Sequence, residues 1–345
     1  MGALLISPSN PWLQVRDLSV TYPGAAIPAV DRVIFSVDAG EAVGILGESG
    51  CGKSTLAASL LRLLPSDATV SGSILWQGRD LMQLGTGDLR RLRGAEISFI
   101  NQEPALALNP VLRVGMQIAE VLRAHLSVPD RKARACEILA EVGFDDPASV
   151  YAAYPHQLSG GQRQRIGIAQ ALACRPRLVI ADEPTSKLDA ALQSELLQLF
   201  ASLRRKHGMA FLLITHDPGV LAAFAGRVLV MYAGRIVEQA GVDRLFAQPS
   251  HPYTAALTHI ALETFAAVQG QLEAGRPRPA TLRRFTQITA GPVAARGCRY
   301  EPRCPDRMQV CRDAEPQITV LDATSSVSCF KHVAQPPSAV DKGIR

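Results

Sequence analysis

Residues 47–54 constrain the fold more than any other part of the chain. They read Gly47-Glu-Ser-Gly-Cys-Gly-Lys-Ser54 and fit the pattern G-x-x-x-x-G-K-[ST]. The apolar run before them predicts a buried strand, and residues 54–64 have helical spacing. In a strand–loop–helix of this kind the glycines let backbone N–H groups surround phosphate oxygens, and the helix N-terminus adds positive potential. We therefore predict a phosphate-binding loop. An accidental glycine-rich turn is the alternative, which the flanking strand and helix disfavour.

The loop predicts specific contacts with a nucleotide and a metal ion. Lys53 is expected to reach the β- and γ-phosphates, and Ser54 to ligate Mg²⁺. The residues that we assign to this nucleotide site are Gly47, Ser49, Gly50, Cys51, Gly52, Lys53, Ser54 and Thr55.

A second element supplies carboxylates. Leu178-Val-Ile-Ala-Asp-Glu183 is an apolar strand that ends in two acidic residues. Asp182 can hold Mg²⁺ directly or through water, and Glu183 can polarise an attacking water as a general base. The alternative is that both side chains merely cap the next segment. The phosphate loop elsewhere in the chain makes the catalytic interpretation the stronger one.

Three further side chains are candidates for the same site. His216 and Gln102 follow the predicted strands 211–214 and 97–100. Ligands of open α/β sheets bind at the C-terminal ends of parallel strands, so we expect His216 near the γ-phosphate and the attacking water. Gln102 is expected to sense Mg²⁺ or that water. Tyr22 is expected to stack on the nucleotide base, or else to be an ordinary core or edge aromatic residue.

The segment Leu158-Ser-Gly-Gly-Gln162 predicts a second anion-binding helix terminus. Ser159 is a good N-cap, Gly160 and Gly161 leave their N–H groups bare, and the segment is expected to open a helix that runs through 163–173. A second phosphate cradle is useful if it closes over the nucleotide of a different chain. The pattern therefore favours two subunits with nucleotide between them, and a simple helix start with a flexible turn is the alternative.

The remaining pattern sets the domain organisation. Strands alternate with helices over residues 13–241, which predicts an α/β fold with a parallel sheet, an edge strand at 70–76 and a helical insert at about 104–165. Hydrophobic residues make up 47% of the 345, which excludes a largely disordered chain, and no apolar run approaches the roughly 18 residues of a membrane span. Aromatic residues make up only 5%, and no basic block exceeds three residues, so no nucleic-acid partner is expected. The start of the chain lacks a signal peptide's basic segment, so a cytoplasmic location is expected.

The cysteines are unevenly distributed. Cys298, Cys304, Cys311 and Cys329 fall within 32 residues. Without an export signal, such a group indicates a metal or iron–sulfur site before disulfides. Four thiolates can hold a [4Fe–4S] cluster or zinc, but structural zinc sites usually pair cysteines at C-x2–4-C, and the gaps here are wider. Two disulfides are the third alternative.

Together, these motifs resemble those of the ATP-binding subunits of ABC transporters. In chain order they are Tyr22 (aromatic loop), 47–55 (Walker A), Gln102 (Q-loop), 158–162 (signature), 178–183 (Walker B), 186–189 with Asp189 (D-loop) and His216 (switch histidine). The resemblance implies a P-loop ABC cassette of the α/β class, with a parallel sheet core, an antiparallel β subdomain and a helical subdomain. It implies that Lys53, Ser54, Gln102 and Asp182 contact ATP and Mg²⁺, with Glu183 as base and His216 orienting water. Ser159, Gly160, Gly161 and Gln162 would contact the γ-phosphate of ATP held by the partner subunit.

Other motifs are similar to those of oligopeptide and dipeptide importer ATPases. They are Gln102-Glu-Pro, Leu108-Asn-Pro110, Tyr154-Pro-His-Gln-Leu-Ser159 and His251-Pro-Tyr-Thr254. That family carries a C-terminal extension with cysteines as here, beside Arg303-Cys-Pro305 and Glu315-Pro316, and some members are understood to bind a [4Fe–4S] cluster there. The resemblance implies an ABC domain at 12–248, a small irregular Cys-rich module at 249–335 and a disordered tail at 336–345.

The resemblance also implies a function. The chain would be an ATPase subunit that couples ATP hydrolysis to uptake of di- or oligopeptides, at the cytoplasmic face of the inner membrane. Its implied partners are two transmembrane permease subunits, a second identical or homologous ATP-binding subunit and, indirectly, an extracytoplasmic substrate-binding protein. The alternatives are uptake of nickel, glutathione or another small solute, a soluble ATPase outside transport, and a redox-sensing tail that regulates the ATPase.

Overall fold

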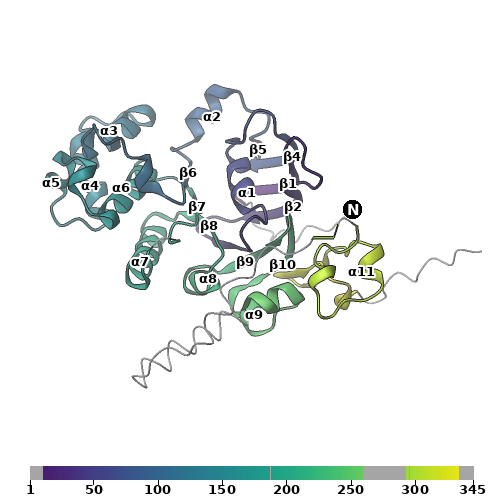
Figure 1. Cartoon of the computed structure of the whole chain (residues 1–345). Coiled ribbons are helices and arrows are strands. Elements are labelled where there is room, and N and C mark those ends of the chain that lie inside the picture. Colours follow the sequence, from purple (N-terminus) through teal and green to yellow (C-terminus); the bar gives the residue numbers. More distant parts are fainter. Residues whose placement is uncertain (1–10, 187, 259–292, 295, 334–345) are drawn as a thin grey trace, which may run out of the picture.

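The computed structural model describes residues 11–186, 188–258, 293–294 and 296–333, and it contains two sheets (Figure 1). The smaller is antiparallel, with strand order β2-β1-β4-β5. Its strands are β1 (Leu13–Thr21), β2 (Val30–Val37), β4 (Thr69–Trp76) and β5 (Arg79–Asp80). The predicted edge strand at 70–76 is wrong in its position, because β4 lies between β1 and the two-residue strand β5.

The larger sheet carries the phosphate loop. Its eight strands have the order β11-β12-β10-β9-β3-β8-β7-β6. The parallel part consists of β3 (Ala42–Leu46), β6 (Ile97–Ile100), β7 (Leu178–Asp182), β8 (Ala210–Thr215) and β9 (Arg227–Tyr232). β3 and β7 are buried along their whole length, as expected of parallel strands that are covered on both faces. The remaining strands, β10 (Arg235–Gly241), β11 (Thr319–Asp322) and β12 (Ser325–Val327), pair antiparallel.

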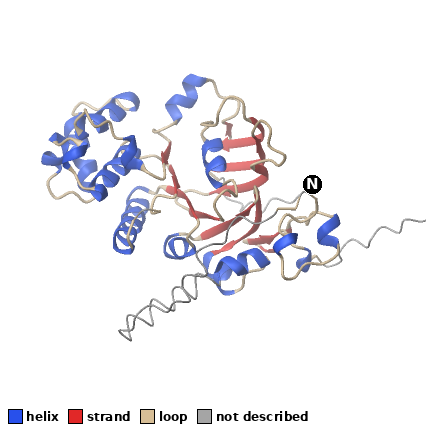
Figure 2. Ribbon diagram, viewed as in Figure 1, coloured by secondary structure: helices blue, strands red, loops and turns tan. Residues whose placement is uncertain are grey.

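The helices form two groups. Close to the sheets lie α1 (Lys53–Leu60), α2 (Thr86–Leu92), α7 (Ala190–His207), α8 (Pro218–Phe224) and α9 (Val242–Ala247) (Figure 1). The predicted helical insert forms a separate group at one side of the molecule (Figures 1 and 2). It comprises η1 (Pro104–Ala107), α3 (Val114–His125), α4 (Arg131–Glu141), α5 (Pro147–Ala152), η2 (Pro155–Gln157) and α6 (Gly160–Leu172).

One helix is shorter than predicted, and another begins at its predicted N-cap. α1 ends at Leu60 rather than near residue 64, because Arg62 adopts a left-handed backbone with a φ of 51°. α6 begins at Gly160, directly after Ser159, which is its N-cap as predicted. The Ser159 side chain accepts a hydrogen bond from Gln162 N at 3.2 Å, and the Gln162 side chain accepts one from Ser159 N at 2.9 Å. This reciprocal cap lets the helix start directly after Ser159.

The C-terminal segment, from residue 249 onward, packs against the preceding part of the chain. Residues 252–258 are helical, and the rest of this segment contains η4 (Glu301–Arg303), α11 (Val310–Asp313) and η5 (Phe330–His332) with the strands β11 and β12. β12 pairs with β10, so these two strands extend the sheet that holds the phosphate loop. The predicted disordered tail at 336–345 lies outside the described residues.

Apolar side chains alternate along the strands and supply a core on each face of the large sheet. On β3, Val43 and Ile45 belong to the core that faces the antiparallel sheet, and Ala42 and Leu46 belong to the core that faces the helical group. The strand is therefore fixed from both sides, and the loop that follows it starts from a rigid support. Among the described residues, no helix has the length and apolar character needed to cross a membrane.

Candidate functional site

The loop between β3 and α1 needs its glycines for two physical reasons. Gly50 and Gly52 have φ values of 80° and 106°, in the left-handed region that favours glycine. A Cβ at Gly52 would also lie 2.0 Å from the Ala29 carbonyl oxygen, and one at Gly47 would lie 2.3 Å from the Met231 carbonyl oxygen. Neighbouring backbone therefore surrounds the loop closely, and this crowding holds it in one conformation.

Lys53 folds back over this loop. Its ammonium group donates hydrogen bonds to the carbonyl oxygens of Gly47 at 2.7 Å and of Glu48 at 2.9 Å, and the residue is only 5% exposed. A buried ammonium needs such acceptors. Phosphate oxygens offer stronger, charged acceptors for the same group. Lys53 is thus held at the loop in the orientation from which it can exchange carbonyls for phosphate.

Asp182 carries an acceptor without a partner. It ends β7 and is 8% exposed, and its Oδ1 atom has no hydrogen-bond partner among the described residues. Burial raises the pKa of Asp182, while a hydrogen bond with Ser54 and the charge of Lys53 lower it. A buried, unpaired carboxylate oxygen is costly unless something positive binds there. The Asp182 carboxylate and the Ser54 hydroxyl are the oxygen ligands that Mg²⁺ prefers, so these residues fit a magnesium site.

The side chains of Glu183 and His216 are hydrogen-bonded to each other. The distance between Glu183 Oε1 and His216 Nδ1 is 3.0 Å. A hydrogen bond with His216 lowers the pKa of Glu183, and the same bond raises the pKa of His216. Glu183 has a φ of 47°, and its N–H donates to the Ile214 carbonyl oxygen at 2.8 Å. This left-handed turn at the end of β7 separates the direction of Glu183 from that of Asp182.

The other predicted residues are distributed around this centre. The Gln102 side chain donates to Ser186 Oγ at 3.4 Å, which joins the loop after β6 to the loop after β7. Asp189 caps α7 by accepting from Leu192 N at 3.0 Å. The Tyr22 hydroxyl lies 3.3 Å from Thr55 Oγ1, so Tyr22 stands beside the first turn of α1.

The predicted second anion site lies apart from the first. Ser159, Gly160 and Gly161 start α6 within the helical group, far from α1 in Figure 1. A Cβ at Gly160 would meet no atom within 4 Å, so this terminus is open. The structure therefore brings Lys53, Ser54, Asp182, Glu183 and His216 together and leaves the signature segment separate.

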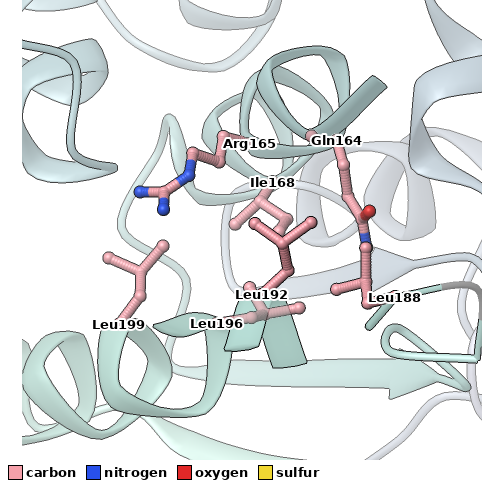
Figure 3. Close-up of a pocket in the computed structure, with 8 residues that line it drawn as sticks. Gln164, Arg165, Ile168, Leu188, Leu192, Leu196 and Leu199 are labelled. Atoms are coloured by element: carbon pink, nitrogen blue, oxygen red, sulfur yellow. The ribbon is translucent and has the colours of Figure 1, made fainter. Parts of the chain in front are cut away.

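The signature helix is nevertheless joined to the segment after Glu183. Ile168 of α6 and Leu188, Leu192, Leu196 and Leu199 line one small pocket between α6 and α7 (Figure 3). Gln164 of α6 donates to the Pro184 carbonyl oxygen at 2.6 Å. A displacement of α6 would therefore also move Pro184, the residue next to Glu183.

The predicted metal site at the cysteines is not supported. The described residues, which include all four cysteines of the C-terminal group, contain no set of three or more His, Cys, Asp or Glu side chains placed to hold a metal ion. Burial, together with the charges of Cys311, Cys329 and Cys304, raises the pKa of Cys298 to about 11. The thiols therefore influence one another without forming a coordination sphere.

A contact that sequence reasoning missed joins the C-terminal segment to the phosphate loop. Arg303 pairs with Glu48 of the loop, and the Tyr253 hydroxyl accepts a hydrogen bond from Glu48 N. Arg303 and Tyr253 belong to short motifs that the resemblance singles out, but nothing in their spacing indicates where they lie in three dimensions.

Family models and known proteins agree with this geometry. The model described as ABC transporter matches residues 30–186, and the one described as oligopeptide/dipeptide transporter, C-terminal region, matches residues 237–311. An oligopeptide transport ATP-binding protein of Bacillus subtilis is 41% identical over 330 residues, which are 92% of this chain and 96% of that protein. A dipeptide transport ATP-binding protein of Escherichia coli is 41% identical over 90% of this chain and 93% of its own length.

Solved structures show the same likeness. A dimeric ATP-binding cassette in a post-hydrolysis state, bound to ADP and phosphate, has a TM-score of 0.59 and 27% identity, and the match covers 67% of this chain and 98% of that one. A subunit of the cbiONQ ABC transporter complex of Clostridium perfringens has a TM-score of 0.63 and 25% identity, over 78% of this chain and all of that one. The chain belongs to the family of ATP-binding subunits of ABC transporters, in its oligopeptide and dipeptide branch.

Proposed function

We propose that this chain is the ATP-hydrolysing subunit of an importer for di- or oligopeptides. As a member of its family it hydrolyses ATP. The observation that carries the proposal is the separation of two complementary half-sites in one chain. Lys53, Asp182 and Glu183 lie at one edge of the large sheet, and the open helix terminus at Ser159 lies in the helical group. The relatives named for oligopeptide and dipeptide transport support the choice of cargo.

The residues of the first half-site divide the work of hydrolysis. Lys53 would exchange its carbonyl acceptors for the β- and γ-phosphates, and Ser54 and Asp182 would hold Mg²⁺. Bound Mg²⁺ would neutralise charge that develops on the phosphate oxygens. Glu183 would accept the proton of the attacking water, and for this it must leave its ion pair with His216. His216 would then be free to donate to the γ-phosphate, and Tyr22 would stack on adenine.

The second half-site would act on a partner's nucleotide. Ser159 and the N–H groups of Gly160 and Gly161 would bind the γ-phosphate of ATP held by a second ATP-binding subunit. The contact between Gln164 and the Pro184 carbonyl would then report that engagement to Glu183. Asp189 and Gln102 would contribute to the same communication across the dimer, each from a loop that follows a strand.

The permease would dock on the helical group. Leu106 and Val111 are 76% and 75% exposed, and Met116 of α3 is 48% exposed. These apolar side chains follow Gln102, so a partner seated on them would sense the Q-loop. All three lie in one short stretch of the chain, residues 106–116, which would form part of the docking surface. We place the chain on the cytoplasmic face of the inner membrane, against two permease subunits that an extracytoplasmic binding protein supplies with cargo.

For the cysteine segment we propose a structural iron–sulfur cluster, with zinc as the second candidate. Binding would require the four thiols to converge further than they do here. The support is that the four thiols lie near one another, since Cys311, Cys329 and Cys304 all act on the charge of Cys298. A bound metal ion would have to overcome the burial that raises the pKa of these thiols, because it binds them as thiolates. Iron, sulfide and zinc would be measured in anaerobically purified wild-type protein and in Cys304→Ser. A metal-free wild-type protein would refute the site.

The importer proposal is tested by purifying the tagged chain from its native membranes in mild detergent. Two multi-span permease subunits and an ATP-binding subunit should accompany it, and peptides presented with the binding protein should stimulate its ATPase activity. Stimulation of the ATPase activity by nickel or glutathione, and not by peptides, would show that the cargo is not a peptide. Recovery with ribosomal proteins or nucleic acid, and without permeases, would contradict a role in transport.

A further inference from the structure

Glu48 is the loop residue to which the glycine-lysine pattern assigns no role, and the structure holds it at three points. Its carboxylate accepts two hydrogen bonds from the Arg303 guanidinium, both at 2.9 Å. Its N–H donates to the Tyr253 hydroxyl at 3.0 Å, and its carbonyl accepts from Lys53 Nζ at 2.9 Å. Two of these partners come from the C-terminal segment, 205 and 255 positions along the chain.

Arg303 and Tyr253 are themselves firmly placed. The Arg303 guanidinium lies 5.7 Å from the ring centroids of both Tyr232 and Tyr300. The Tyr253 ring lies 4.7 Å from that of Tyr232 and 5.3 Å from that of Tyr300, between centroids. Tyr253 is 1% exposed, and burial raises the pKa of its phenol, which therefore stays neutral. These packed aromatic rings fix the donor and the acceptor that meet Glu48.

The Glu48 carboxylate is a liability at a site for a polyphosphate. Its side chain is only 9% exposed, so solvent screens its charge poorly. Glu48 directly follows Gly47, whose carbonyl and that of Glu48 hold the Lys53 ammonium where phosphate is to bind. Left unpaired, the carboxylate would repel the nucleotide or turn toward Lys53 and compete for it. The bidentate pair with Arg303 prevents both outcomes.

We propose that Arg303 and Tyr253 are positioning residues of the nucleotide site, through which the C-terminal segment holds Glu48 and keeps the phosphate loop neutralised and preorganised for ATP. This role rests on the ATP site proposed above. It makes the C-terminal segment part of the nucleotide-binding apparatus of its own chain. Preorganisation of this kind lowers the entropy that the loop loses on binding.

The test measures ATP affinity of the full chain and steady-state hydrolysis for a set of variants. Arg303→Gln leaves Glu48 charged and unpaired, so the dissociation constant and KM for ATP should rise about tenfold or more, which is about 1.4 kcal/mol or more. The kcat should stay within about twofold, because Glu183 and His216 are untouched. Tyr253→Phe keeps the ring but leaves Glu48 N–H without an acceptor, and KM should rise by a smaller factor.

A double variant separates this role from simple packing. In Glu48→Gln/Arg303→Gln the loop carries no unpaired charge, so ATP affinity should recover most of what Arg303→Gln loses. Arg303→Lys keeps the positive charge but cannot donate two parallel hydrogen bonds to the carboxylate. Its ATP affinity should therefore lie between that of Arg303→Gln and that of the wild type. Arg312→Gln is the matched control, because Arg312 lies in the same segment, is 57% exposed and pairs with Glu301 instead.

The outcomes are distinct. A double variant as weak as Arg303→Gln alone would overturn the proposal and leave Arg303 a packing residue. Unchanged ATP affinity in both Arg303→Gln and Tyr253→Phe would also overturn it. Wild-type protein that binds no ATP would instead contradict the nucleotide site itself. If Arg303→Gln fails to fold in thermal unfolding measurements, Tyr253→Phe still decides the question.

Discussion

At the scale of single residues, the hydrogen bond between Glu183 and His216 joins the two side chains to which we assign hydrolysis. Glu183 Oε1 and His216 Nδ1 lie 3.0 Å apart, so in the proposed mechanism this contact opens before Glu183 accepts a proton. Asp182, one position earlier, has an oxygen without a partner among the described residues. The two adjacent carboxylates therefore differ, since Glu183 has a side-chain partner and Asp182 Oδ1 has none among the described residues.

Glu183→Gln should separate binding from hydrolysis. The amide keeps the size of the side chain but cannot accept a proton, so phosphate release should slow by about 100-fold or more. ATP affinity should stay within a few-fold of wild type, because Lys53, Ser54 and Asp182 are unchanged. Glu137→Gln, an exposed carboxylate that pairs with Arg134, is the control. Hydrolysis in Glu183→Gln at a near wild-type rate would show that another group is the base.

The candidate residues of the ATP site could be proposed from the sequence because each lies in a local pattern. Lys53 follows a glycine run, and Asp182 and His216 each end or follow an apolar strand, so neighbouring strands bring them together. The ion pair between Glu48 and Arg303 joins residues 255 positions apart, and no pattern in the sequence links them. This pair depends on how the C-terminal segment packs against the rest of the chain, and the local sequence does not predict that packing.

At the scale of elements, the start of the helical stretch at 252–258 anchors the C-terminal segment through a buried histidine. His251 is 2% exposed, and its Nδ1 accepts a hydrogen bond from the Tyr253 backbone N–H at 3.0 Å. The backbone N–H of His251 donates to the Glu238 carboxylate of β10 at 2.8 Å. Burial lowers the pKa of His251 to about 3, with a further contribution from His332. The neutral ring is therefore part of the folded structure that places Tyr253 beside Glu48.

The buried ring predicts a loss of stability in acid. Unfolded His251 would bind a proton below about pH 6.5, whereas the folded form resists it until about pH 3, so stability falls as pH drops through this window. Between pH 7 and pH 5 the loss should be about 2 kcal/mol. Denaturant unfolding at these two pH values measures it. His251→Asn keeps an acceptor for Tyr253 N without titrating, and its stability should depend less on pH. Equal dependence in both proteins would contradict the assignment.

The sequence pattern identified which segments are strands and which are helices, but it did not identify which strands lie next to each other in a sheet. The apolar runs at 43–46, 97–100, 178–181 and 211–214 are all parallel strands, as predicted. The error at 70–76 arises because alternation identifies a strand without saying what pairs with it, and the two residues of β5 are too few to give a pattern. β11 alternates between half-buried and exposed positions, which is a weak signal for a strand that extends a core sheet.

At the scale of the whole molecule, the C-terminal segment and the ABC core share one sheet. β10 lies between β9, which pairs with the strand before the phosphate loop, and β12 of the C-terminal segment. Ion pairs strengthen this junction. Arg299 pairs with Asp31 of β2, and Glu315 pairs with Arg32 and Arg235. A change in the cysteine segment therefore has a continuous path of packed groups to the nucleotide site.

In one chain the start of α6 lies in the helical group, away from the phosphate loop, so the contact that we propose between this terminus and a γ-phosphate needs a second subunit. Gly160→Asp tests this, because the new side chain has open space in the single chain and would place a carboxylate against a partner's γ-phosphate. Glu183→Gln should form dimers at saturating ATP, seen by light scattering, and the Gly160→Asp/Glu183→Gln chain should stay monomeric with unchanged thermal stability and ATP affinity. Gly87→Asp in the Glu183→Gln background is the control, since a Cβ at that glycine of α2 would also meet nothing within 4 Å.

Dimers that persist despite Gly160→Asp would show that the signature terminus does not lie at the nucleotide interface. A Glu183→Gln chain that stays monomeric would exclude a sandwich of two identical chains, and a homologous partner would have to supply the second terminus.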